Sequence, residues 1–317
     1  MPRMRKQAFV SAFLFVVSLA ALTLAQSRSS TIKIPFETYT LPNGLTVILA
    51  PDSATPTVAV TAWYHVGSKD EMPGRTGFAH LFEHVMFTGA GHTPYGTHDR
   101  LTEGVGGSNN GTTSNDRTVY FETVPANYLE SALWLEADRM GFLLDTLDIG
   151  KLDAQRDVVK NERRQSVDNQ PYGLAGEILS GAIYPPSHPY SWPVIGSMKD
   201  LTAASEEDVK NFFRVYYAPN NAFLSIAGDF KVADAKTWVL KYFGGIPRGK
   251  PITRPSIPQV ALTTETGLVF EDRVQVPRLY IVWPTVGEKS HDRFALSVLD
   301  AITAGPRTTR LTKALVY

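Results

Sequence analysis

The sequence predicts a fold that mixes β-strands with α-helices, as one complete domain followed by the beginning of a second. Three observations lead to this prediction. Segments with strand alternation and segments with helical spacing follow one another through residues 36–245. Residues 246–265 are rich in proline and predict a linker without regular structure. Residues 266–317 then restart the pattern, and we expect an incomplete domain that is too short to bury a core of its own.

Strands are predicted where apolar residues alternate, or where β-branched and aromatic residues gather between turn signals. The Asn43-Gly44 pair predicts a tight turn between two strands within residues 38–50. Further strands are expected at residues 57–66, 112–123 and 222–227.

Helices are predicted from composition and spacing at residues 78–88, 129–144, 152–167 and 206–217. Thr76 and Ser205 are candidate N-caps of the first and the last of these helices, and Gly89 is a candidate stop signal for the first.

The second half of the chain repeats an order of strand-like and helical segments that is found in the first half. Residues 268–270 and 277–283 resemble the strand segments at 47–49 and 56–63, and a helix is expected at 293–302. This internal repeat predicts two related domains.

The first 25 residues have the pattern of a secretory signal peptide. Arg3, Arg5 and Lys6 precede an almost wholly apolar run at residues 8–25, and cleavage is expected after Ala25. We therefore expect an exported protein, periplasmic or secreted from a bacterium. The alternative is an uncleaved anchor, which would be the protein's one attachment to a membrane.

The composition of the chain argues against several classes of function. The formal net charge is zero, so no basic excess points to nucleic acid as a partner. The chain has no cysteine, which excludes disulfides, a cysteine nucleophile and a cysteine-ligated zinc site.

The helix predicted at residues 78–88 places three polar side chains in apolar surroundings. A helix that is apolar on all sides is buried, and His80, Glu83 and His84 would be costly there without compensation. His80 and His84 share one helix face, from which both can bind a zinc ion. Glu83 lies on the same side, where it can take a proton from a zinc-activated water and return it to the leaving amine. The alternative is two core histidines with local hydrogen bonds.

A catalytic zinc site uses three protein ligands and leaves a fourth position open. Without cysteine, the third ligand must be His, Glu or Asp. On the helix predicted at residues 152–167, Glu162 falls on the same stripe as Leu152 and Val159. We expect Glu162 to face inward as the third ligand; the alternative is a glutamate at the edge of the exposed surface.

These residues resemble the signature of a known family. The segment His80-Leu81-Phe82-Glu83-His84, followed by Glu162, resembles the inverted-zincin signature of the pitrilysin/insulinase family of zinc metallopeptidases. The glycine-rich residues 106–113 and residues 158–164 resemble the flanks of that signature. Stretches within residues 188–229 resemble bacterial processing-peptidase-like members, and the likeness extends over residues 36–317.

The resemblance implies an α+β fold of the LuxS/MPP-like metallohydrolase type, a mixed sheet packed by helices. It implies one Zn²⁺ per chain in the catalytic domain, residues 36–245, with Glu83 as the catalytic residue and His80, His84 and Glu162 as metal ligands. A peptide substrate is expected to add to an edge strand at residues 109–115. The expected substrate contacts are Asn109, Asn110, Gly111 and Thr112. The alternative for the neighbouring residues 106–108 is a simple flexible loop.

Two departures from the family's pattern qualify these expectations. Gln155 stands where many members have a second glutamate, and the substrate-holding Arg and Tyr of the family's second half have no counterpart up to Tyr317. We therefore expect the chain to hold zinc and yet to lack full peptidase activity on its own.

The leading hypothesis is a zinc-dependent metalloendopeptidase acting on small or unfolded polypeptides. The alternative is a non-catalytic partner subunit or scaffold of a heteromeric peptidase, or a chain that is inactive alone. The expected partners are a peptide substrate and a second family subunit, in a homodimer or a heterodimer. A zinc hydrolase of small molecules is a third hypothesis, which the edge-strand signature disfavours because such a strand serves an extended backbone.

Overall fold

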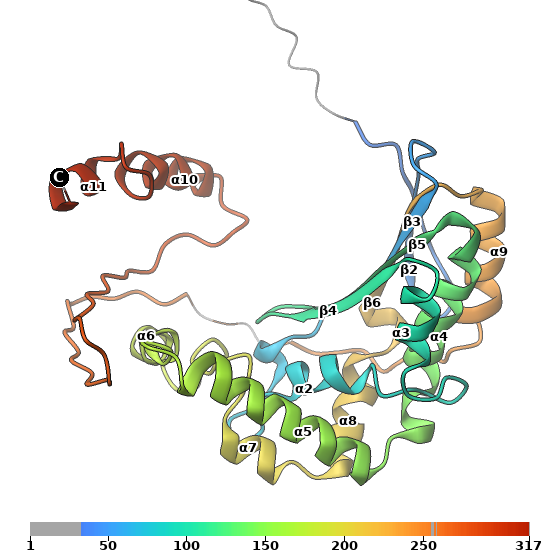
Figure 1. Ribbon diagram of the computed structural model, residues 1–317, viewed down its shortest axis with the longest axis horizontal. Helices are drawn as coiled ribbons and strands as arrows, with labels where there is room; N and C mark the ends of the chain where they lie inside the picture. The colour runs from blue at the N-terminus through green and yellow to red at the C-terminus, as the bar shows by residue number, and fades with distance from the viewer. Residues whose placement is uncertain (1–32, 255–256, 258, 317) are drawn as a thin grey trace, which may run out of the picture. The chain divides into compact units, whose positions relative to one another are not determined.

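The computed structural model describes residues 33–254, 257 and 259–316 and has the expected α+β fold (Figure 1). The predicted signal peptide lies outside the described residues. The six strands of the central sheet are β1 (Glu37–Thr40), β2 (Thr46–Pro51), β3 (Thr57–Tyr64), β4 (Ser108–Thr113), β5 (Thr118–Pro125) and β6 (Ala222–Gly228). Their order is β1-β2-β6-β3-β5-β4. The β2–β6 pair is parallel and the other pairs are antiparallel, so the sheet is mixed.

The helices are α2 (Phe78–Val85), α3 (Thr97–Glu103), α4 (Leu129–Thr146), α5 (Ile149–Arg163), α6 (Ala175–Ile183), α7 (Met198–Ala203), α8 (Glu206–Tyr216), α9 (Val232–Phe243), α10 (Asp292–Thr303) and α11 (Arg310–Val316). The predicted helices at 129–144, 206–217 and 293–302 are confirmed by α4, α8 and α10. Ser205 caps α8 as expected, because its hydroxyl accepts a hydrogen bond from the Asp208 N–H.

The core lies between one face of the sheet and the helices. On β3, the side chains of Val58, Val60 and Ala62 are fully buried, whereas those of Thr61 and Trp63 on the other face are half-buried. This alternation follows from the two-residue period of a strand. Helix α4 contacts β3, β5 and α9 on the buried face, and α2 contacts β4, β5 and α5.

Three local predictions were wrong. The single strand expected at 112–123 is two antiparallel strands, β4 and β5, because the chain turns where the Ser114 N–H donates to the Arg117 carbonyl at 2.8 Å. Thr76 does not cap α2. The N-cap is Gly77, and the Thr76 hydroxyl donates instead to Asp200, at 2.6 Å. Helix α2 also ends at Val85, before Gly89.

The linker expected at residues 246–265 has no helix or strand among its described residues. It is nevertheless anchored, since the guanidinium of Arg254 pairs with the Asp70 carboxylate at 3.3 Å and donates to the His65 carbonyl.

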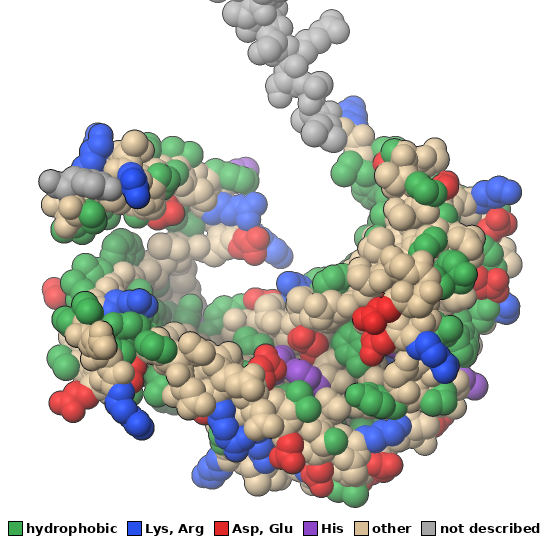
Figure 2. Space-filling view, viewed as in Figure 1, with side chains coloured by type: hydrophobic (Ala, Val, Ile, Leu, Met, Phe, Trp, Pro, Cys, Tyr) green, Lys and Arg blue, Asp and Glu red, His purple; other side chains and the backbone are tan. Residues whose placement is uncertain are grey.

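Residues 259–290 contain no strand, although the repeat suggested two. Their apolar side chains are largely exposed: Val269 is 98% and Trp283 is 68% accessible. Hydrophobic side chains also show on the surface at α10 (Figure 2). A strand needs a neighbour to take up its backbone hydrogen bonds, and the described residues offer these segments none.

None of the helices within the described ranges is long and apolar enough to cross a membrane.

We predict that Leu133→Ala, in the core on α4, lowers the free energy of unfolding by about 2–5 kcal/mol, because it leaves a cavity. Leu133 is 0% exposed. The matched control is Leu240→Ala on α9, where the side chain is 59% exposed and the expected change is within about 0.5 kcal/mol. Urea unfolding measures both. Equal losses would contradict the assignment of the core to this face of the sheet.

Candidate metal centre

Two helices bring the predicted metal ligands together. His80 and His84 lie one turn apart on α2, and Glu162 lies in the last turn of α5. The distance from His84 Nε2 to Glu162 Oε2 is 3.2 Å, and that from His80 Nε2 to the same oxygen is 3.7 Å. The three donor atoms all lie within 4.8 Å of one another. One ion can therefore reach all three.

The donor chemistry of this group fits zinc, which binds imidazole nitrogens and carboxylate oxygens. The exposed fractions of the side chains rise from 11% for His80 through 22% for His84 to 44% for Glu162, so the group is open on the Glu162 side. Burial, followed by the proximity of His84, lowers the pKa of His80 below its ordinary value. That shift favours the neutral imidazole, which is the form that binds a metal.

Glu83 is held beside the two histidines by strand β4. The Thr113 hydroxyl donates a 2.5 Å hydrogen bond to Oε2 of Glu83. A Cβ added at Gly111 would lie only 2.9 Å from Cγ of Glu83. The strand can approach Glu83 because Gly111 has no side chain. The result is a carboxylate in fixed orientation next to the candidate ligands, as a general base requires.

Thr113 was not singled out from the sequence as a site residue. Strand alternation could have found it, since Thr113 is two residues from Gly111 and faces the same side.

Strand β4 ends the sheet among the described residues, because the strand order leaves it paired with β5 alone. The expected substrate residues lie on it in different surroundings. Asn110 is exposed, and its side-chain oxygen accepts a hydrogen bond from the Gly111 N–H at 2.8 Å. The Asn109 amide instead donates to the Thr102 hydroxyl at 2.6 Å, toward α3. The hydroxyl of Thr112 accepts from Arg117 at 2.6 Å.

A second group of potential ligands lies deep in the core and differs from the first. It consists of His98 on α3, Glu122 on β5 and Glu136 on α4. Arg139 already supplies a positive charge there, since its Nε donates to Glu136 at 2.9 Å and its guanidinium lies 4.5 Å from the Tyr120 ring centre. A metal ion would have to compete with that cation, so we assign no metal to this group.

The ionisation of this second group follows from burial. Burial, followed by repulsion from Glu136, raises the pKa of Glu122 well above its usual range. Burial, followed by the charge of Arg139, lowers the pKa of His98 to about 2. Neither the ring nitrogens of His98 nor the carboxyl oxygens of Glu122 have a hydrogen-bond partner among the described residues. The neutral forms of both side chains are therefore favoured.

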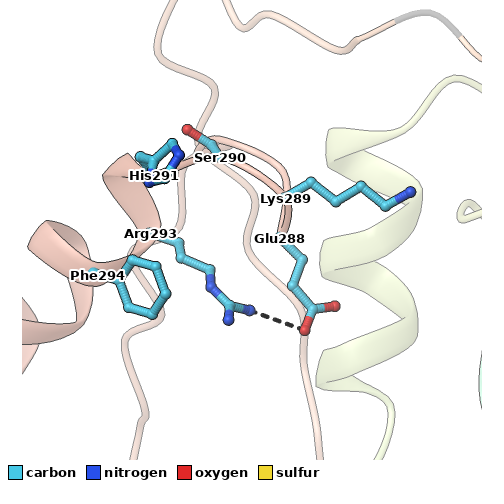
Figure 3. Close-up of a pocket in the computed structure, with 6 residues that line it drawn as sticks. All are labelled: Glu288, Lys289, Ser290, His291, Arg293 and Phe294. Atoms are coloured by element: carbon cyan, nitrogen blue, oxygen red, sulfur yellow. Dashed lines mark hydrogen bonds and ion pairs between the residues drawn. The ribbon is translucent and has the colours of Figure 1, made fainter. Parts of the chain in front are cut away.

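A surface depression at the start of α10 offers no comparable chemistry (Figure 3). Two of its charged side chains, Arg293 and Glu288, are paired with each other at 3.0 Å. Arg293 also lies over the Phe294 ring, 4.7 Å from its centre. We therefore place the candidate site at α2, α5 and β4.

Family models match most of the chain. The model described as insulinase (peptidase family M16) matches residues 46–185, and the model described as the peptidase M16 inactive domain matches residues 203–317.

Individual relatives are named as a zinc protease and as a subunit of a processing peptidase. The chain is 30% identical over 315 residues to the zinc protease PqqE of Helicobacter pylori, covering 97% of this chain and 70% of the relative. It is 27% identical over 237 residues to the mitochondrial-processing peptidase subunit beta of Blastocladiella emersonii, covering 74% of this chain and 50% of the relative. A solved structure of a protease from Helicobacter pylori has a TM-score of 0.76 at 29% identity, over 90% of this chain and 69% of that one.

We predict that Glu122→Gln raises the free energy of unfolding above that of the parent, and that this difference grows as the pH rises. An unfolded Glu ionises near pH 4.3, whereas burial keeps the folded Glu122 protonated to higher pH. Between the two pKa values the folded state holds more protons, so the parent loses stability with rising pH, by at most about 1.4 kcal/mol per pH unit for one proton.

The measurement is urea unfolding of the metal-free parent and variant between about pH 5 and about pH 8. Glu103→Gln, at an exposed position of α3, is the control and should run parallel to the parent. A gain from Glu122→Gln that does not change with pH would show that Glu122 is ionised in the folded protein.

Proposed function

Because the chain belongs to the insulinase family of peptidases, family M16, we propose that it is a zinc-dependent metalloendopeptidase that hydrolyses small or unfolded polypeptides. The observation that carries this proposal is the convergence of His80 and His84 with Glu162, and with Glu83 beside them. The names of its relatives support a zinc peptidase in general. The choice of endopeptidase and of substrate is our inference from the site.

His80, His84 and Glu162 are proposed to hold one Zn²⁺ through two nitrogens and one oxygen. A zinc ion in such a site acts as a Lewis acid and lowers the pKa of a water molecule toward about 7. Helix α2 fixes the spacing of the two imidazoles, and α5 supplies the carboxylate from the opposite side. Because Glu162 is the most exposed of the three side chains, we propose that substrate approaches from its side.

Glu83 is proposed as the general base. Its carboxylate would accept a proton from the attacking water and later deliver it to the amine of the departing peptide. The hydrogen bond from Thr113 orients Oε2 of Glu83 and limits the rotation of the carboxylate. This orientation would keep Glu83 ready for proton transfer without allowing it to replace a metal ligand.

Strand β4 is proposed to bind the substrate backbone as an added strand, through Asn109, Asn110, Gly111 and Thr112. An edge strand offers N–H and C=O groups to an extended peptide. The Gly111 N–H, which donates to the side-chain oxygen of Asn110, would exchange that hydrogen bond for one to the peptide. Since Thr113 of the same strand contacts Glu83, a peptide paired along β4 would run past the base. Asn110 is the residue best suited to contact it, because its side chain is exposed on this strand.

The second candidate function is a non-catalytic subunit that binds a partner of the same family. The match of residues 203–317 to the inactive-domain model favours it, as does the likeness to a protein named as a processing-peptidase subunit. We also propose that the protein is exported to the periplasm or secreted, on the strength of the signal-like residues 1–25.

We predict that Glu83→Gln keeps zinc and loses peptide cleavage. A proton-transfer group of this kind contributes about 10²–10⁴-fold to the rate. Zinc content by metal analysis and cleavage of a quenched fluorescent peptide test this, with Glu103→Gln as a control at an exposed glutamate. If the zinc-loaded parent shows no cleavage at all, not even the partial activity expected of this chain on its own, the non-catalytic role replaces the peptidase proposal. If cleavage survives Glu83→Gln, Glu83 is not the base.

We predict that Glu162→Ala weakens zinc binding strongly, because two histidines alone leave the ion without its third ligand. The control is Asp157→Ala, which removes an exposed carboxylate from the same helix. Competition with a chromophoric chelator measures both dissociation constants. Wild-type affinity in Glu162→Ala would remove Glu162 from the ligand set.

A further inference from the structure

The N-terminus of α2 is held by a residue outside the helix. Its N-cap is Gly77, which has no side chain to accept hydrogen bonds from the first turn. The Glu71 carboxylate takes over that role: Oε2 accepts from the Gly77 N–H at 2.9 Å and Oε1 from the Ala79 N–H at 2.8 Å. The first N–H groups of a helix have no partners within it, so carboxyl oxygens placed there satisfy them.

Glu71 thereby fixes the residue directly before a candidate ligand. Ala79 is followed by His80, and the bond to Oε1 of Glu71 is made by the Ala79 N–H itself. Glu71 is only 7% exposed, so these bonds are shielded from water. A displacement of this carboxylate would move the first turn of α2 together with His80.

The same end of α2 is linked to α5 through Gly196, which lies between α6 and α7. A Cβ added at Gly196 would lie 2.4 Å from Cα of Gly77, so the two glycines touch. The Gly196 carbonyl accepts a hydrogen bond from Arg163 at 3.0 Å. Arg163 directly follows Glu162 on α5. The contact therefore joins the helix that carries both histidines to the residue beside the candidate third ligand.

We propose that Glu71 is a positioning residue that sets the first turn of α2 against Gly196 and so fixes the distance between His80 and Glu162. This inference rests on the proposed zinc-binding function of that site. Metal ligands must sit within about 0.2 Å of their ideal distances, so a small shift of one helix weakens the whole set. Residues that orient ligands from outside typically change metal affinity by about 10–100-fold when they are replaced.

Glu71→Gln is the first test. The amide keeps the shape of the side chain, but its nitrogen cannot accept, so one of the two backbone bonds is lost. We expect the zinc dissociation constant to rise by about 10-fold or more. The visible spectrum of the cobalt-substituted protein should also change, since it reports ligand geometry. Glu265→Gln, at an exposed glutamate, is the control and should match the parent in both measurements.

Gly196→Ala is the second, independent variant. It removes no polar group, but its Cβ would collide with Gly77, and its φ of +76° disfavours alanine. We expect the same direction of change in zinc affinity and in the cobalt spectrum. Circular dichroism of the metal-free proteins checks folding.

The outcomes separate this inference from the proposed function. A parent that binds no zinc at the His80 site would overturn both. A parent that binds zinc, with dissociation constants and cobalt spectra unchanged in Glu71→Gln and Gly196→Ala, would overturn the positioning role alone. A purely structural role would lower the stability of the metal-free variants and leave the cobalt spectrum as it is in the parent.

Discussion

The constraint on which the structure depends is that α2 must be buried and must still carry polar side chains. Its apolar side is fixed by aromatic packing, as Phe82 stacks on Phe212 with ring centres 5.8 Å apart and the Tyr120 hydroxyl donates to the Phe82 carbonyl at 3.1 Å. The polar side turns toward α5 and β4. Glu162 lies 3.2 Å from His84 and Thr113 donates to Glu83, which offsets part of the cost of burying these polar groups. Nδ1 of His80 has no hydrogen-bond partner among the described residues.

Strand β4 connects the proposed base, Glu83, with the proposed peptide-binding edge of the sheet. Gly111 allows β4 to approach Glu83 closely, and the Thr113 hydroxyl donates a hydrogen bond to Glu83. The edge of β4 that faces away from β5 has no partner strand among the described residues. A peptide paired along that edge would therefore lie next to Glu83, the proposed base. The close approach of β4 to Glu83 explains why a glycine, Gly111, occupies a strand interior, where glycine is otherwise unfavourable.

The buried residues around Arg139 contact the aromatic rings that pack against β4 at Gly111. The Arg139 guanidinium lies over the rings of Tyr120 and Phe87, and both rings are close to Gly111. Its pairing with Glu136 satisfies the buried charge at close range. Strand β4 thus packs at Gly111 against the same two rings that the Arg139 guanidinium contacts, and ionisation of the nearby buried Glu122 would disturb this group.

The sequence by itself determined the features that depend on local pattern. Spacing along α2 was enough to place His80, Glu83 and His84 together, and the Ser205 signal was enough to start α8, because both are set within a few neighbouring residues. Tertiary structure alone decided the rest. The first N–H groups of α2 donate to the Glu71 side chain and not to Thr76, since folding brings that carboxyl group to N–H groups six and eight residues away. The approach of Glu162 to the histidines depends on how α5 lies against α2. The segments at 268–283 show the same rule, because apolar strand-like sequence becomes a strand only where another backbone meets its hydrogen bonds.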